Sequence, residues 1–166
     1  MQIKNSIILG IDPGYGRTGY GVIHKEYNNL TCKTTGCIET AKTLPYPKRL
    51  ATISHDLTIL IRDYAPTCVA LEKLFFARNA LTALRVAETR GIIILLAEQH
   101  NIPVYEFSPM EVKIAVSGYG KADKIQVQTM VTKLLQLNAI PRPDDAADAL
   151  AIAITAAHSF HVIYNT

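Results

Sequence analysis

The sequence predicts an α/β fold built on one five-stranded mixed sheet, a three-strand meander plus two βα units, with helices on both faces. Three short apolar or alternating runs fill the first 40 residues and are separated by Gly and Asn turn signals. The rest of the chain alternates helical periodicity with two further short apolar runs. A meander extended by right-handed crossovers yields one mixed sheet with helices on both of its faces.

Five segments have the pattern of strands. The first is an apolar run that ends at Asp12, and Asn28-Asn29 indicates a hairpin turn between the second and third. The fourth ends at Leu71, directly before Glu72. The predicted strands are residues 7–12, 20–24, 30–40, 67–71 and 103–107.

Helical spacing predicts the remaining elements. Apolar positions from Leu50 to Tyr64 form one stripe that Pro66 ends, and Asn79 is a plausible N-cap for the next helix. Three further helices are expected at residues 109–116, 122–137 and 145–159. In the helix at 80–99, residues 92–97 are apolar all round, so we expect cover on more than one side, with a second subunit as a candidate beside the sheet.

Bulk composition bounds the class of protein. The chain has 166 residues, 49% apolar and 19% charged, which predicts one globular domain spanning residues 1–166. The formal charge is +3, an excess too small to imply nucleic acid by itself. Three cysteines without CxxC spacing indicate buried free thiols in a reducing compartment. The apolar stretches are shorter than the ~20 residues that a membrane span needs, so we expect a cytoplasmic protein.

Four acidic residues stand where apolar segments begin or end: Asp12, Glu72, Asp145 and Asp148. Singly, each is as consistent with a turn, a solvated strand end or a helix N-terminal acid as with a site. Together, two strand ends and two acids on one face of a helix predict that the carboxylates converge. Crowded carboxylates require protonation or a cation, and oxygen-only ligands favour Mg²⁺ or Mn²⁺. The pattern therefore indicates metal-assisted phosphoryl chemistry.

Over nearly its full length the chain resembles the RuvC-type Holliday junction resolvases, crossover junction endodeoxyribonucleases of the ribonuclease H-like fold. Four stretches carry the resemblance, in the same order as in the family. They are Ile8-Leu9-Gly10-Ile11-Asp12-Pro13-Gly14 with residues 18–23, Glu72-Lys73-Leu74-Phe75 with Asn79, residues 118–127 beginning Gly-Tyr-Gly-Lys, and Asp145-Ala146-Ala147-Asp148 with residues 149–153.

The resemblance implies a nuclease that resolves four-way DNA junctions symmetrically in recombination and repair and leaves 5′-phosphates. By resemblance, Asp12, Glu72, Asp145 and Asp148 hold Mg²⁺, with Mn²⁺ as a substitute and two ions per subunit expected. Asp148 could instead orient Asp145 or a water molecule without binding the ion directly. Lys124 matches a family lysine beside the catalytic acids and could neutralise charge in the transition state.

The resemblance also implies DNA contacts around the acids. Phe75 matches an aromatic position that stacks on a base at the junction centre, although core packing is an even alternative for it. The other expected contacts are basic or amide side chains that would bind phosphates, for each of which a solvated surface position is the simpler interpretation. They are Arg78, Asn79, Lys113, Lys121 and Lys124, and Arg85 and Arg90 belong with Arg78 to the basic residues of the helix after Glu72 that could bind phosphate.

Partners and alternatives complete the predictions. Four-way junction DNA and a second copy of the chain are expected, because a two-fold dimer matches a substrate with two-fold symmetry; the family also implies docking to a branch-migration motor complex. One alternative is a related ribonuclease H-like nuclease that acts on RNA. Another is a phosphate-binding domain of the actin-like ATPase type, which however needs a second domain and a second glycine-rich loop. An inert nucleic-acid binding module would have no use for four acids.

Overall fold

The computed structural model describes residues 5–74 and 80–163, and it contains the predicted five-stranded sheet in the order β3-β2-β1-β4-β5. The meander pairs antiparallel, whereas β1 with β4 and β4 with β5 pair parallel. The mixed sheet predicted from the sequence is therefore confirmed. The strands are β1 (Asn5–Asp12), β2 (Arg17–Glu26), β3 (Asn29–Glu39), β4 (Cys68–Glu72) and β5 (Val104–Phe107).

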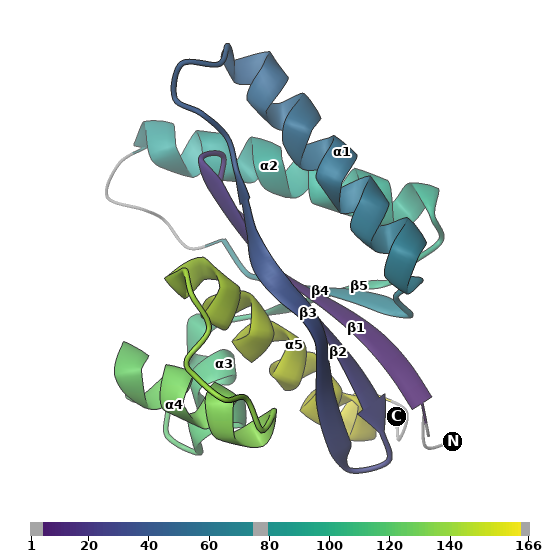
Figure 1. The fold of residues 1–166 in the computed structure, drawn as a ribbon, viewed down its shortest axis with the longest axis vertical. Helices are drawn as coiled ribbons and strands as arrows, with labels where there is room; N and C mark the ends of the chain where they lie inside the picture. The colour runs from purple at the N-terminus through teal and green to yellow at the C-terminus, as the bar shows by residue number, and fades with distance from the viewer. Residues whose placement is uncertain (1–4, 75–79, 164–166) are drawn as a thin grey trace.

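Helices cover both faces of the sheet, as Figure 1 shows. On one face lie α1 (Tyr46–Tyr64) and α2 (Ala80–Gln99). On the other lie α3 (Pro109–Ser117), α4 (Lys124–Leu134) and α5 (Asp144–Ile163). The sheet lies between the two groups of helices.

Capping explains where two helix starts differ from the sequence prediction. The helix expected from residue 122 begins at Lys124, because the Asp123 side chain accepts a hydrogen bond from the Gln126 N–H at 2.8 Å. The Gln126 side chain in turn accepts from the Asp123 N–H at 2.9 Å. The last helix, expected from residue 145, begins one residue earlier, with Asp144 inside the first turn of α5.

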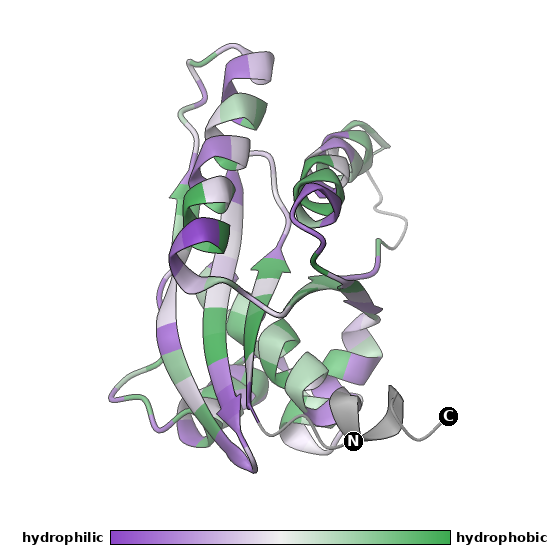
Figure 2. Ribbon diagram, turned by 90° about the vertical axis from the view of Figure 1, so that its right-hand side faces the viewer, coloured by the Kyte–Doolittle hydropathy of each residue, from purple (hydrophilic) through white to green (hydrophobic). Residues whose placement is uncertain are grey.

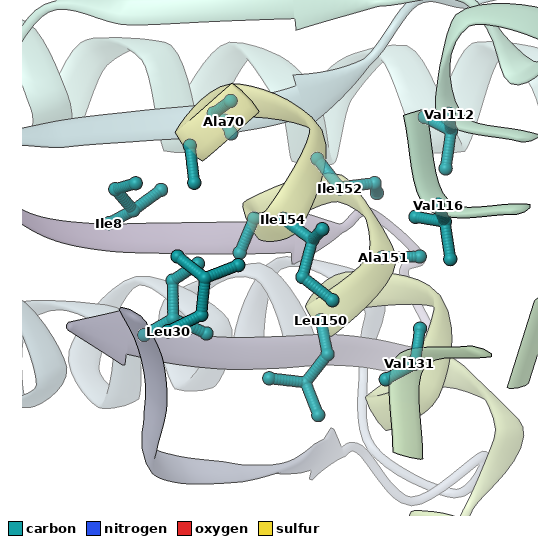
Figure 3. Close-up of a cluster of buried hydrophobic side chains, with 14 of the residues drawn as sticks. Ile8, Leu30, Ala70, Val112, Val116, Val131, Leu150, Ala151, Ile152 and Ile154 are labelled. Carbon is teal, nitrogen blue, oxygen red and sulfur yellow. The ribbon is translucent and has the colours of Figure 1, made fainter. Parts of the chain in front are cut away.

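Helix α5 forms the centre of one core. Its side chains at positions 150–154 contact Ile8 and Leu30 of the sheet and Val116 and Val131 of the flanking helices, as Figure 3 shows. The backbone of α5 comes unusually close to the sheet at Gly10, where an added Cβ would overlap the Ala149 carbonyl oxygen and lie 2.8 Å from the Ala153 Cβ. A side chain at position 10 would therefore push the helix away.

The second core lies under α1 and α2. The predicted stripe of α1 buries Ile53, Leu57 and Ile61, and α1 alternates hydrophilic and hydrophobic residues in Figure 2. Helix α2 buries one face only and leaves large apolar side chains exposed on the other. These are Leu81, Leu84, Ile94 and Leu95.

Two composition-based expectations are refined by the structure. All three cysteines are free thiols, but only Cys68 is buried, while Cys32 and Cys37 are half-buried. Among the described helices, none has the length and apolarity to cross a bilayer.

Candidate active site

Two predicted acids meet at one edge of the sheet. Asp12 is the last residue of β1 and Glu72 the last of β4. Because these strands run parallel, with Ile11 opposite Leu71, both carboxylates leave the sheet at the same edge. Asp148, in the second turn of α5, joins them in lining a pocket of about 230 Å³. We call this site the acidic pocket.

The fourth predicted acid is brought near by a glycine. Asp12 pairs in register with Gly19 of β2, and an added Cβ on Gly19 would overlap the Asp145 carbonyl oxygen and lie 2.9 Å from the Asp145 Cβ. Only a residue without a side chain admits the first turn of α5 to this place. The start of α5 is therefore fixed beside Asp12 by main-chain contact.

The electrostatics of the acidic pocket show crowded negative charge. Burial, followed by the nearby carboxylates of Asp148, Glu72 and Asp145, raises the pKa of Asp12 from 3.8 to about 7. Burial, then Asp148, also raises the pKa of Glu72. Burial raises the pKa of Asp148 as well, although Lys124 opposes the shift. The two lysines that line the pocket, Lys113 and Lys124, do not fully offset this crowding, since the pKa of each of the three acids stays raised.

Two cations occupy part of the acidic surface. The Lys124 Nζ lies 3.3 Å from Asp148 Oδ2 and 3.1 Å from Asp144 Oδ2. The Arg17 Nη2 lies 3.0 Å from Asp145 Oδ2, and Asp145 does not line the acidic pocket. Among the described residues, no three acidic, thiol or imidazole side chains stand close enough together to hold one ion between them. The structure thus gathers Asp12, Glu72 and Asp148 around one space and keeps Asp145 turned to Arg17.

The chemistry of the donors nevertheless fits a hard dication. Every candidate ligand is a carboxylate oxygen, and Asp12 and Glu72 are carried on rigid strand ends. Burial, followed by the neighbouring carboxylates, raises the pKa values of Asp12 and Glu72, and a bound cation would favour the charged form of both against these effects. Gathering all four acids on metal requires Lys124 and Arg17 to release their partners.

Arg90 supports the site in a way that sequence reasoning missed. The sequence groups it with arginines of the helix after Glu72 that could bind phosphate. The structure buries Arg90, whose guanidinium donates to the Glu72 carbonyl oxygen and to Glu106 Oε1. Arg90 therefore fastens the end of β4 instead of presenting its charge to a ligand.

The expected DNA contacts are placed unequally. Lys113 and Lys124 line the acidic pocket, and Lys121 is exposed in the connection between α3 and α4. Phe75, Arg78 and Asn79 lie outside the described residues. Beside the acidic pocket lies a set of tyrosines and arginines, of which the sequence indicated Arg85 alone, because the residues of this set share neither a motif nor a period.

Sequence comparisons identify relatives with the same expected chemistry. The family model described as crossover junction endodeoxyribonuclease RuvC matches residues 8–156. A protein of that description from Thermosipho melanesiensis is 52% identical over 146 residues, which cover 88% of this chain and 93% of the relative. Another from Desulfitobacterium hafniense is 49% identical over 157 residues, 95% of each chain.

Solved structures agree with the sequence matches. Thermus thermophilus RuvC, in a complex with a Holliday junction substrate, is 34% identical with a TM-score of 0.89, covering 97% of each chain. The yeast mitochondrial Holliday junction resolvase has a TM-score of 0.67 at 18% identity, over 95% of this chain and 81% of that one. This second likeness shows a common fold alone.

Proposed function

The chain belongs to the RuvC family of crossover junction endodeoxyribonucleases, the Holliday junction resolvases, and on that premise we propose how its residues divide the reaction. The activity is hydrolysis of a phosphodiester on each of two strands of a four-way DNA junction. The observation that carries the residue assignment is the acidic pocket, where Asp12, Glu72 and Asp148 line one space and burial raises the pKa of each.

Asp12, Glu72, Asp145 and Asp148 would hold Mg²⁺ or Mn²⁺, two ions per subunit. When bound, the ions activate the attacking water and stabilise the departing 3′ oxygen. Asp12 and Glu72 contribute fixed carboxylates because both are anchored in the sheet and Arg90 holds the Glu72 main chain.

Lysines balance charge in the same pocket. Lys124 reaches Asp148 across a 3.3 Å ion pair, so its ammonium is within reach of a phosphate seated among the acids. Lys113 lines the pocket and lowers the pKa of Glu72 against the raising effects of burial and Asp148. Both lysines can therefore offset the charge of an incoming phosphate. Lys121, Phe75, Arg78 and Asn79 would supply further DNA contacts.

A cleavage assay separates this function from its alternatives. The chain is incubated with a synthetic four-way junction, linear duplex DNA and structured RNA, each with Mg²⁺ and with EDTA. We expect symmetric nicks with 5′-phosphates in the junction alone, and in the presence of Mg²⁺ alone. Preferential cutting of RNA would instead support the RNA nuclease, and nucleotide hydrolysis without strand cleavage would support the ATPase-type domain.

The dimer is proposed on the exposed face of α2. Leu81, Leu84 and Leu95 are 59%, 63% and 56% exposed, and their spacing places them on one side of the helix. A strip of this kind is costly in water and is typical of a subunit interface. The second copy would give the two active sites that two symmetric cuts require.

Analytical ultracentrifugation tests the dimer. The double substitution Leu84→Glu with Leu95→Glu should give a monomer at micromolar concentration, while the wild type sediments as a dimer. Ile114→Glu is the matched control, since Ile114 is 50% exposed on α3, on the opposite side of the sheet. A wild-type monomer, or a dimer unaffected by the double substitution, would contradict the proposal.

Three wider assignments belong to the same proposal: a single nuclease domain over residues 1–166, a cytoplasmic location, and docking to a branch-migration motor complex. The match to bacterial relatives over nearly their full length supports the single domain, while the location and the docking are carried over from the family resemblance. Co-sedimentation of the chain with the motor proteins on a junction tests the docking, and limited proteolysis that yields one resistant core tests the single domain.

A further inference from the structure

We propose that a second cleft, beside the acidic pocket, binds a backbone phosphate of the junction strand close to the scissile linkage. We call it the basic cleft; its volume is about 1010 Å³. It is formed by the turn between β1 and β2, the end of β3, and the N-terminal halves of α1 and α2. The inference rests on the chain acting on junction DNA, and it concerns Tyr15, Tyr46, Arg49 and Arg85.

Arg49 is a buried cation without an acidic partner. Its residue is only 7% exposed, and its Nε donates to Thr40 Oγ1 at 2.8 Å. Its Cζ lies 4.9 Å from the centre of the Tyr15 ring. Within the described part of the chain, no carboxylate forms an ion pair with it. Burying a guanidinium without counter-charge is costly, so the site is completed by an anion from outside the chain.

Arg85 repeats this arrangement from the neighbouring helix. Its Cζ lies 5.2 Å from the Tyr15 ring centre and 4.8 Å from that of Tyr46. The centres of the two rings lie 6.2 Å apart, with one ring edge toward the face of the other. The Tyr46 hydroxyl donates a hydrogen bond to the Glu88 carboxylate. Cation–π contact fixes a guanidinium plane without using its N–H donors. Both arginines are thus held in place with donors left for a ligand.

The charge lining the basic cleft selects an anion. Besides Arg49 and Arg85, the lining of the cleft includes the cations Arg17 and Lys42. It also includes one acid, Glu39, whose Oε1 lies 3.8 Å from the Arg17 Nε. An excess of positive charge repels metal cations. Guanidinium groups match the tetrahedral oxygens of phosphate with paired hydrogen bonds, which makes a nucleic-acid phosphate the fitting ligand.

The basic cleft and the acidic pocket are joined. A space of about 230 Å³ between them is lined by Asp12 and Glu72 of the acidic pocket and by Thr82 and Val86, which also line the basic cleft. Gly14, only two residues after Asp12, lines the basic cleft as well. A strand whose scissile phosphate lies at Asp12 therefore has a path that places a neighbouring phosphate at Arg49 and Arg85.

The test is a double-mutant cycle between protein and DNA, measured as junction binding by fluorescence anisotropy in EDTA. One arm is Arg85→Gln or Arg49→Gln. The other replaces single phosphates near the cut by neutral methylphosphonates, one linkage at a time. Arg62→Gln is the matched control, because Arg62 makes the same charge change on the last turn of α1, outside the basic cleft, and is 71% exposed. Thermal melting checks that each variant folds.

We expect Arg85→Gln to weaken binding by about tenfold and to reduce the slope of log affinity against log salt by about 1, the loss of one phosphate contact. One linkage should lose its methylphosphonate penalty in this variant and keep it in Arg62→Gln. If Arg49→Gln fails to fold, Arg85, which is only half-buried, decides the matter. A full penalty at every linkage in Arg85→Gln overturns the basic cleft.

A cleavage assay with Mg²⁺, run beside the binding measurements, distinguishes failure of the basic cleft from failure of the proposed function. A wild type that cleaves junctions with Mg²⁺ but shows no coupling at any linkage leaves the nuclease assignment intact and removes the basic cleft. A wild type that binds junctions without cutting them removes the nuclease assignment itself. Equal losses in Arg62→Gln and Arg85→Gln would also overturn the inference, because net charge would then explain the effect.

Discussion

The acidic pocket and the basic cleft lie at the same edge of the sheet but solve opposite electrostatic problems. In the acidic pocket, Asp12, Glu72 and Asp148 crowd together, and the pKa of each stays raised although Lys113 and Lys124 line the same space. In the basic cleft, Arg49 and Arg85 stand on tyrosine rings, and the described residues form no ion pair with either of them. An ion pair between Arg17, which lines the basic cleft, and Asp145 at the start of α5 links the two regions. On the proposals above, dications would complete the acidic pocket and phosphates the basic cleft.

The two regions also depend on different parts of the fold. The acidic pocket uses α3, α4 and α5, whereas the basic cleft uses α1 and α2 on the opposite face of the sheet. Chemistry and strand binding should therefore respond to different substitutions. The following experiments test that separation, from the largest expected effect to the smallest.

Asp12→Asn should separate the two regions most strongly. We expect cleavage to fall by at least about a thousandfold, because loss of an ion ligand removes several kcal/mol of transition-state stabilisation. Junction binding in EDTA should be unchanged or tighter, since one negative charge near the strand is gone. Single-turnover cleavage and anisotropy measure the two quantities. Near-normal cleavage would remove Asp12 from the chemistry.

Gly10→Ala should damage the acidic pocket through packing. The new Cβ would lie 2.7 Å from the Ala153 nitrogen and overlap the Ala149 carbonyl oxygen, so α5 must shift. We expect a loss of about 1–3 kcal/mol in the free energy of unfolding, the usual cost of overpacking, and slower cleavage. Urea denaturation measures the first effect.

Gly91→Ala is the control for that packing experiment. An added Cβ at this position in α2 meets no heavy atom within 4 Å, so the helix should gain about 0.5–1 kcal/mol. Equal destabilisation by both alanines would show that close approach of α5 is not what matters at position 10. Junction affinity per folded molecule should stay constant in Gly10→Ala, because position 10 does not touch the basic cleft; for Gly91, which lies on the exposed side of α2, stability alone is compared.

Lys124→Gln should change the cleavage rate and the affinity for metal ions in opposite directions. Its ammonium contacts Asp148 and Asp144, so its removal should slow cleavage by about 10- to 100-fold, as loss of a supporting partner does. The same change removes a competing cation, and Mn²⁺ should bind more tightly in calorimetry. Weaker Mn²⁺ binding would mean that Lys124 organises the acids instead of competing for them.

The last experiment does not measure cleavage: it follows the pH dependence of the stability of the metal-free protein. The pKa of Asp12 is raised to about 7 in the folded state, chiefly by burial, from 3.8. The folded chain therefore holds a proton that the unfolded chain has lost, and stability falls as pH rises from about 4 to about 7. Each kcal/mol lost lowers Tm by about 2–4 °C.

Thermal melting in EDTA across that pH window checks the effect. Asp12→Asn should make the profile shallower, since one titrating group is gone, while Glu72 and Asp148, whose pKa values burial also raises, still titrate. Added Mg²⁺ should raise Tm more at pH 7.5 than at pH 5, because deprotonated carboxylates are the ligands. A melting temperature that rises with pH in the metal-free wild type would contradict the assigned crowding.

What the sequence could predict follows from periodicity. Asp12 and Glu72 close apolar runs, so topology alone places them at one sheet edge, and α2 begins and ends where its pattern predicts. The pairing of Asp145 with Arg17 could not be predicted, because it depends on side-chain rotamers. The burial of Arg90 against the Glu72 main chain follows from the packing angle of α2, which no spacing reveals.

The basic cleft was beyond the sequence for a different reason. Tyr15, Thr40, Arg49 and Arg85 belong to separate elements, and none repeats at a helical or strand period. Arg85 was expected to bind phosphate as part of the helix after Glu72, but Tyr15, Thr40 and Arg49 look like ordinary polar residues until the turn after β1 folds onto α1 and α2. Motifs show chemistry gathered in short stretches, whereas this cleft exists only through tertiary contact.

The glycines under α5 have a consequence for anyone who wishes to make this enzyme more heat-resistant. Replacing glycine to stiffen a chain is a common engineering route, but at Gly10 and Gly19 it would move the helix that carries two of the acids. Hardening must therefore be sought on α1, on α2 at Gly91, and in the hairpin between β2 and β3. The half of the molecule that contains the acidic pocket must keep glycine at these two positions.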